Sequence, residues 1–247
     1  MNTYRTAEIA AIIGIHPNTV RLYEEWGLIS KPERKENGYR IFTDLHIQQI
    51  QLARTAFQIE VLQSGLRKKM VAMLKTAADR DFEKAIILTQ EYLGQLKKEQ
   101  KNAEEAIQIV QHIMSGSPKS NEHSMKRKEV SEYLGISMDT LRNWEMNGLL
   151  AVRRKENGYR VYSDDDIRRL KIIRSLRCAN YSLEAILHLL RQLSKNPDTD
   201  IRTALNISPQ TDSIISVCDR LILSLSEAEK NAEKILLMLE KMKIQDF

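Results

Sequence analysis

The sequence has few of the residues that interrupt or cross-link a chain, with 9 glycines, 5 prolines and 2 cysteines among 247 residues. So little glycine and proline favours long, uninterrupted helices. The two cysteines lie in separate helical stretches, which offers no disulfide framework and suits a reducing compartment. Aromatic residues make up only 6% of the chain, and this argues mildly against an aromatic cage for a drug-like ligand.

Long apolar runs are also missing. No stretch approaches the roughly 20 apolar residues that a membrane-spanning helix needs. The first residues, MNTYRTAEIAAIIGI, lack the basic segment, apolar run and small-residue cleavage site of a secretion signal. We therefore expect a soluble protein without a membrane partner that works in the cytoplasm. The net charge is only +5, but 38 Lys and Arg residues allow local patches that bind polyanions.

Motifs for catalysis and for metal binding are absent as well. The sequence has no phosphate-cradling glycine loop and no nucleophile motif, so we do not expect an enzyme. Cys178 and Cys218 are interpreted as small core residues. The five histidines show no ligand spacing, so no metal or other cofactor is expected. They are His16, His46, His112, His123 and His188.

The most informative feature that is present is an internal repeat. The seven residues RKENGYR at 34–40 occur again unchanged at 154–160. The preceding residues match too, since IAAIIGIHPNTVRLYEEWGLI at 9–29 is paralleled by VSEYLGISMDTLRNWEMNGLL at 130–150. Solenoid repeats recur every 20 to 50 residues or so. Two copies this far apart therefore indicate a duplicated domain.

Each copy begins with a pattern typical of a helix-turn-helix and a wing. In the first copy we expect helices at 6–13 and 16–25, with Gly14 in the turn between them. A hairpin follows, with strand-like residues at 28–29 and 39–42 and with Asn37-Gly38 as a strong turn signal. A third helix is expected at 44–57 and, in the second copy, at 164–178. A fourth begins near Glu60 and Ser182.

Each copy then continues into a long helix with coiled-coil spacing. In the second copy, apolar residues alternate spacings of four and three, as in a coiled-coil seam. This seam contains Ile214, Cys218, Leu221, Leu225, Ala228, Ala232, Ile235, Leu239 and Met242. The less regular series of the first copy contains Ile86, Leu93, Leu96, Gln100, Ala103, Ile107, Val110 and Met114. KNAE occurs at 101–104 and at 230–233, so the duplication extends into the arms.

These elements predict a mostly α-helical fold with two winged helix-turn-helix heads, each followed by a long coiled-coil helix. We place the heads at 1–58 and 125–181 and the helical arms at 59–114 and 182–247. The linker at 115–124, SGSPKSNEHS, is rich in serine, glycine and proline. Residues 194–212 have no counterpart in the first copy, and we expect a solvated loop there.

This layout resembles the MerR family of bacterial transcription regulators, with the unit present twice. In that family the second helix reads T-[LIV]-R-x-[YF]-E and the wing reads N-G-Y-R. This chain has TVRLYE at 19–24, TLRNWE at 140–145 and NGYR in both wings. The resemblance implies transcription regulation by sequence-specific binding to double-stranded promoter DNA. It also implies bending and untwisting of the promoter spacer, so that RNA polymerase engages both promoter elements.

The resemblance and the chemistry of recognition together select candidate DNA contacts. An arginine on the second helix can grip guanine or neutralise a phosphate, and a neighbouring aromatic side chain can donate one hydrogen bond to a phosphate. Wing residues can approach the flanking backbone. The first head contributes Asn18, Thr19, Arg21, Tyr23, Arg34, Lys35, Asn37, Tyr39 and Arg40. The second contributes Asp139, Thr140, Arg142, Trp144, Arg153, Arg154, Lys155, Asn157, Tyr159 and Arg160.

Some alternatives stay open at this point. Tyr39 and Tyr159 could be core residues, and Arg40 and Arg160 could pair with a nearby acidic residue. The two arms could pair antiparallel within one chain and mimic the family's usual dimer, or they could pair between chains in a homodimer. A DNA-architectural or recombination accessory role, as in excisionases, is the alternative to transcription regulation.

The two copies differ where sequence would be read. Their wings share seven residues, but their second helices differ. His16, Asn18 and Leu22 of the first copy are replaced by Ser137, Asp139 and Asn143 in the second copy. Phosphate contacts position a protein and base contacts specify sequence. We therefore expect common docking on the backbone of an asymmetric operator, with two unlike half-sites.

Overall fold

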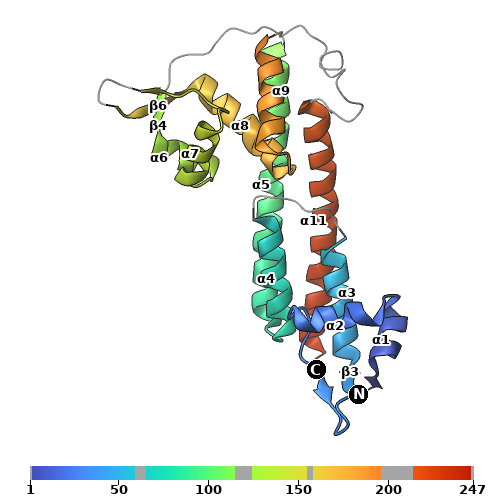
Figure 1. Ribbon diagram of the computed structural model, residues 1–247. Coiled ribbons are helices and arrows are strands. Elements are labelled where there is room, and N and C mark those ends of the chain that lie inside the picture. The colour runs from blue at the N-terminus through green and yellow to red at the C-terminus, as the bar shows by residue number, and fades with distance from the viewer. Residues whose placement is uncertain (1, 59–64, 115–123, 155–157, 196–213, 246–247) are drawn as a thin grey trace. The chain divides into compact units, whose positions relative to one another are not determined.

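The computed structural model describes residues 2–58, 65–114, 124–154, 158–195 and 214–245 (Figure 1). The chain folds into two compact units, one formed by residues 1–98 with 224–247 and the other by residues 99–223. Each unit contains one head and a segment of both long helices. The prediction of a mostly helical fold with two winged helix-turn-helix heads is confirmed.

The first head is a helix-turn-helix with a three-stranded wing sheet. Gly14 ends the first helix in the left-handed conformation, with φ 73°, which glycine adopts without steric cost. The strands are antiparallel in the order β1-β3-β2. The elements are β1 (Thr3–Tyr4), α1 (Thr6–Ile13), α2 (Pro17–Glu25), β2 (Glu33–Arg34), β3 (Arg40–Thr43) and α3 (Asp44–Ala56).

The second head repeats this topology element by element, which is the structural counterpart of the sequence repeat. Gly135 ends its first helix with φ 63°, and its sheet has the order β4-β6-β5. Its elements are β4 (Ser124–Lys126), α6 (Arg127–Leu134), α7 (Met138–Met146), β5 (Arg153–Arg154), β6 (Arg160–Ser163) and α8 (Asp164–Cys178).

One expectation about the wing is wrong. Leu28 and Ile29 do not form a strand; each is only 3% exposed and packs in the core directly after α2. The strand that folds back onto β3 across the wing turn is β2, which lies nearer the turn. The third strand of each sheet, β1 or β4, has only two or three residues, too short for a periodic sequence signal.

The same helix cap is built from different residues in the two heads. At the start of α3, the Thr43 N–H donates to His46 Nδ1 over 3.0 Å. At the start of α8, the Ser163 N–H donates to Asp166 Oδ2 over 2.8 Å. Burial lowers the pKa of His46 below its ordinary value, so the ring is neutral at neutral pH and one of its nitrogens can accept a hydrogen bond.

The shorter arm helices are α4 (Leu66–Ala78) and α9 (Leu183–Lys195). The predicted start near Glu60 lies outside the described residues, and α9 begins one residue after the predicted Ser182. Most of the expected linker lies outside them too. Of the loop expected at 194–212, the first two residues belong to the end of α9 and the rest is not described.

The long helices α5 (Phe82–Met114) and α11 (Ile214–Ile244) run side by side within each unit (Figure 1). In the first unit, Lys97 lies 3.4 Å from Glu229. Near the other end of that segment, Lys243 lies 2.6 Å from Glu83. The later residue of α11 thus meets the earlier residue of α5, so the helices are antiparallel. In the second unit, Val110 of α5 shares a core with the first turn of α11.

The predicted seam of α11 is confirmed, because all nine of its residues are at most 3% exposed. The series in α5 is only partly right. Leu96, Ala103 and Val110 are buried as expected, and the side chain of Met114 is not described. The predicted Ile86, Leu93, Gln100 and Ile107 are only half-buried, and the residue before each of them is buried in its place: Ala85, Tyr92, Glu99 and Ala106.

Each head packs on the arm of the other copy. In the first unit, Asn231 Nδ2 of α11 donates to Gln58 Oε1, which follows α3, over 3.4 Å. In the second unit, Ser175 Oγ of α8 donates to the carbonyl oxygen of Asn102 in α5 over 3.1 Å. Asn102 and Asn231 are equivalent positions of the repeated KNAE, so the two docking arrangements are reciprocal.

A buried ion pair strengthens the docking in the second unit. Arg174 of α8 donates two hydrogen bonds to Glu99 of α5, over 2.7 and 2.8 Å. Lys171, one turn earlier, lies 2.5 Å from Glu105. In the first unit the equivalent of Arg174 is Arg54, which is exposed, and the equivalent of Glu99 is Ala228. The two heads are therefore held on their arms by different chemistry.

The cysteines are core residues, as predicted. Cys178 is 1% exposed and Cys218 is fully buried. Burial raises the pKa of the Cys218 thiol to about 12, so this group is protonated at neutral pH. Within the described ranges, no three His, Cys, Asp or Glu side chains cluster as metal ligands would. Nor does any helix there have the length and apolar character needed to cross a membrane.

Candidate nucleic-acid interface

The second helix of each head turns one side into the core and the other into solvent. In α2, Val20 is fully buried and Tyr23 is 8% exposed, whereas Arg21 and Leu22 are exposed. In α7 the corresponding Arg142 is likewise exposed. Because helical residues one position apart point in different directions, burial of one side fixes the exposure of the two arginines. Both therefore lie on the solvent side of their helix, which is the side that a helix-turn-helix presents to a ligand.

Side chains at the start of each helix hold its first turn, and in α2 one of them also orients the arginine. His16 Nδ1 accepts from the Asn18 N–H over 3.1 Å, and Ser137 Oγ accepts from the Thr140 N–H over 3.0 Å. The Asn18 side chain accepts a hydrogen bond from Arg21 over 3.0 Å. Asp139 replaces Asn18 in the second head and is exposed, so the two helices present different chemistry at this point.

Four of the candidate DNA-contact residues in the second helices are less exposed to solvent than the two arginines. Trp144 is only 4% exposed, so at most the edge of its ring reaches solvent. Burial raises the pKa of Tyr23, so its hydroxyl remains a donor at neutral pH. Thr19 and Thr140 are half-buried. Thr140 Oγ1 also lies 2.8 Å from Ser137 Oγ, which ties it into the helix cap.

The turn of the first wing is stabilised by its own backbone. The Lys35 N–H donates to the Tyr39 carbonyl over 2.9 Å, and the Gly38 N–H donates to the Lys35 carbonyl over 2.8 Å. Gly38 has φ 81°, which requires glycine or a strained residue. The Asn37 side chain accepts from the Tyr39 N–H over 3.3 Å. Asn37 therefore shapes the turn, while the Lys35 side chain is exposed.

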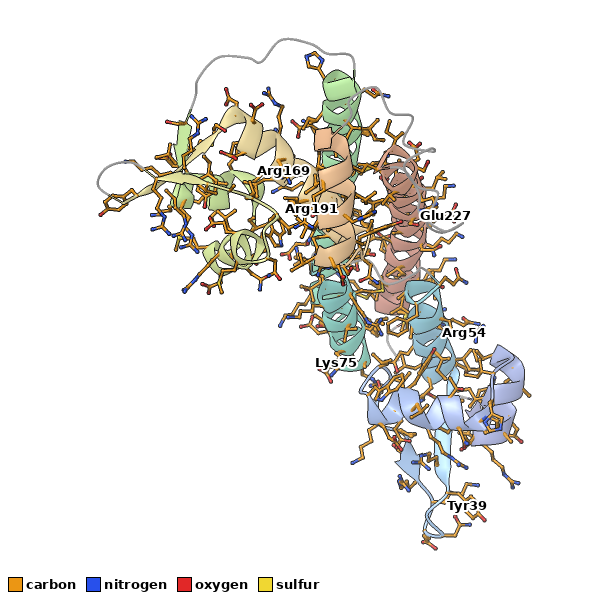
Figure 2. All side chains as sticks on the ribbon, turned by 45° about the horizontal axis from the view of Figure 1, so that its top comes forward. Tyr39, Arg54, Lys75, Arg169, Arg191 and Glu227 are labelled. Carbon is orange, nitrogen blue, oxygen red and sulfur yellow. The ribbon has the colours of Figure 1, made fainter. Side chains whose placement is uncertain are left out.

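Both wing tyrosines are exposed. Tyr39 is 68% exposed and Tyr159 is 73% exposed, and Figure 2 shows Tyr39 at the wing tip. The alternative that they are core residues is wrong. In the second wing, Arg153 and Arg154 are exposed, and Gly158 has φ 78°. Lys155 and Asn157 lie outside the described residues.

A glutamate at the end of each second helix holds the wing, and this role was not predicted. Glu24 Oε2 lies 2.5 Å from Arg40 Nε, and its other oxygen is 3.7 Å from Arg34. In the second head, Glu145 is 2.7 Å from Arg160 and also accepts from the Tyr162 hydroxyl. Arg40 and Arg160 thus pair with an acidic residue, and each keeps further donors because a guanidinium has five.

The sequence repeat contains both partners of this ion pair. Glu24 and Glu145 match in the repeat, as do Arg40 and Arg160. A repeat preserved in both a carboxylate and a cation is consistent with a contact between them, but the spacing alone cannot show it. The consequence is that the protein itself holds Arg40 and Arg160 in place.

A family model described as MerR HTH family regulatory protein matches this chain twice, at residues 4–71 and 125–193. The two matches confirm that the chain contains two tandem units of that type. A family of regulatory proteins also agrees with the prediction that the chain is not an enzyme. No solved structure matches the chain.

Curated relatives match over part of their length. The HTH-type transcriptional regulator CueR of Escherichia coli O6:H1 is 42% identical over 53 residues, which cover 22% of this chain and 39% of CueR. The mercuric resistance operon regulatory protein of Bacillus cereus is 30% identical over 78 residues, 32% of this chain and 55% of that protein. The regulator ZntR of Escherichia coli K12 is 36% identical over 65 residues, 26% of this chain and 46% of ZntR. The chain thus spans about two fifths to one half of these relatives.

Proposed function

This chain belongs to the MerR family of helix-turn-helix regulatory proteins, and from that premise we propose that it regulates transcription by binding double-stranded promoter DNA in the bacterial cytoplasm. The exposed arginines of α2 and α7 and the exposed wings support this role. Each head combines a helix that fits the major groove with a basic loop beside it.

We propose further that one chain acts as a pseudo-dimer. The main support is that each head packs on the arm of the other copy. The first head contacts α11 through Gln58 and Asn231, while the second contacts α5 through Ser175 and Asn102. In a two-chain dimer such exchanged contacts join different subunits. Here both head–arm contacts are made within one polypeptide. The homodimer with four heads is the alternative arrangement.

Each candidate side chain then has a role in the proposed complex. Arg21 and Arg142 read base edges in the major groove or neutralise phosphates close to it. Lys35, Tyr39, Tyr159 and the exposed wing arginines contact the flanking backbone and fix the register of each head. Arg40 and Arg160, held by the two glutamates, present their remaining donors in a fixed orientation.

The complex can act on transcription by deforming its site. In the proposed complex both heads of one chain bind the same duplex and deform the DNA between them. Bending a site of 20–30 base pairs costs on the order of 1–6 kcal/mol, which added protein contacts can offset. We propose that the chain bends or untwists a promoter spacer in this way, and that RNA polymerase occupies the same promoter.

The mass of the complex tests the pseudo-dimer. One chain has a mass of 28.6 kDa, and we expect sedimentation equilibrium at micromolar concentration to give this mass for the free protein. With a duplex long enough for one site, we expect the mass of one chain plus one duplex. Two chains per duplex at all protein concentrations would support the homodimer instead.

A further inference from the structure

The two heads carry unequal charge, although they share one fold. Residues 1–58 contain seven Lys and Arg against six Asp and Glu, a net charge of +1. Residues 125–181 contain thirteen against eight, a net charge of +5. Affinity for a phosphate backbone depends on cations that reach it, so the location of the extra charge decides whether it matters for DNA.

Part of the extra charge is used inside the protein. Lys171 of α8, which replaces Gln51, pairs with Glu105 of α5, and Arg169, which replaces Gln49, donates to the carbonyl of Leu149 over 2.6 Å. These cations hold the second head on its arm and stabilise the head itself. Any difference in DNA binding must therefore come from the wing, the second helix and the start of the first helix.

The wing strands show the clearest difference. Glu33 of β2 is paired with Ile41, and Arg153 of β5 is paired with Val161, at the same register of the same two-stranded ladder. Both side chains are exposed. A negative charge on the first wing is thus replaced by a positive charge at the same place on the second.

The next residue of each strand differs in its surroundings. Arg34 lies 3.7 Å from Glu24 and donates to the Gly38 carbonyl over 3.3 Å. Arg154, at the equivalent position, is exposed and has no carboxylate within 4.0 Å among the described residues. The charge of Arg34 is partly neutralised within its head, whereas that of Arg154 faces solvent.

The rest of this surface shows the same trend, except at the exposed Asp139, which replaces Asn18. Arg127 and Lys128, at the start of α6, replace Thr6 and Ala7. Beside them is a hollow of about 700 Å³ lined by Lys126, Arg127, Tyr159 and Arg160, and Glu129 is the one carboxylate among the described residues that line it. At the end of the second helix, the exposed acid Glu25 is replaced by Met146, which is 76% exposed.

We propose that the second head is the electrostatic anchor of the protein, and that it supplies the larger part of the salt-dependent affinity for the DNA backbone. This inference rests on the proposed DNA-binding function and deepens it. The first head, whose wing carries Glu33 and a partly neutralised Arg34, contributes less to binding of arbitrary sequence. Its share in the specific complex comes mainly from base contacts.

The matched variants Arg154→Ala and Arg34→Ala, in the full chain, test the proposal. The measurement is the slope of the logarithm of the binding constant against the logarithm of salt concentration, on a duplex of random sequence. Each phosphate contact contributes about 0.9 to this slope. We expect Arg154→Ala to reduce its magnitude by about 1 and Arg34→Ala to reduce it clearly less. An equal or larger effect of Arg34→Ala would overturn the proposal.

A charge addition gives an independent check. We expect Glu33→Arg to increase the slope by about 1, because it copies the second wing onto the first. Glu91→Arg adds the same charge at an exposed position of α5, outside both heads, and is expected to leave the slope unchanged. Equal salt-dependence slopes for Glu33→Arg and Glu91→Arg would contradict the proposal that the second head is the electrostatic anchor. Circular dichroism confirms that each variant is folded, and a wild-type chain without measurable DNA binding would reject the proposed function itself.

Discussion

Replacing Arg174 by alanine is expected to lower the free energy of unfolding by about 3–5 kcal/mol, because it leaves the carboxylate of Glu99 buried and unpaired. Both side chains are almost inaccessible, with relative exposures of 9% and 2%. Water therefore cannot replace the two hydrogen bonds that are lost. The measurement is urea denaturation at neutral pH, followed by circular dichroism and by the fluorescence of the chain's two tryptophans.

The repeat provides a matched control for this prediction. Arg54 occupies the equivalent position in the first head but is exposed, and Ala228 stands opposite in place of Glu99. Arg54→Ala is expected to change stability by no more than about 0.5 kcal/mol. The double variant Arg174→Met with Glu99→Leu is expected to recover most of the loss, since apolar pairs often replace buried ion pairs at little cost. Similar effects of Arg174→Ala and Arg54→Ala would contradict the role of this pair.

The second large effect concerns DNA. Arg21→Ala and Arg142→Ala are each expected to weaken binding to the specific site by about 1–3 kcal/mol, or roughly 5- to 150-fold in the dissociation constant. The arginines belong to separate heads, so the double variant should lose about the sum of the two effects. Fluorescence anisotropy with a labelled duplex measures the loss, at one stated salt concentration.

A cation outside the heads controls for net charge. Lys75 is exposed on α4 (Figure 2), and Lys75→Ala removes one positive charge, as each arginine variant does. Its affinity is expected to stay close to that of the wild type. If Lys75→Ala weakened binding as much as Arg21→Ala and Arg142→Ala, the arginines would act through overall charge alone, and their assignment to the groove would be wrong.

The two long helices illustrate what the sequence can and cannot predict. In α11 every seam position is filled by an apolar residue or cysteine, so spacing alone located all nine buried side chains. In α5 the true seam includes Thr89 and Glu99, which no hydrophobic pattern selects. Thr89 is accommodated because its hydroxyl donates to the Ala85 carbonyl over 2.7 Å, and Glu99 because of a partner 75 residues away.

The same limit applies to the interface. Repeated motifs were sufficient to locate the second helices, the wings and their exposed arginines. They could not decide whether Arg40 pairs with an acid, because Glu24 lies 16 residues away and their contact depends on how the wing folds back. Nor could they show that Tyr39 is exposed, since an aromatic residue next to a strand is equally common in a core.

We propose that two unlike heads of one chain read one site, and selection of bound fragments from a random DNA pool tests this arrangement. At near-physiological salt, we predict enrichment of a single asymmetric site with two different half-sites, because Asn18 and Leu22 of α2 are replaced by Asp139 and Asn143 in α7. Recovery of a perfect palindrome, or no enrichment above the non-specific background, would contradict the proposal that two unlike heads read one asymmetric site.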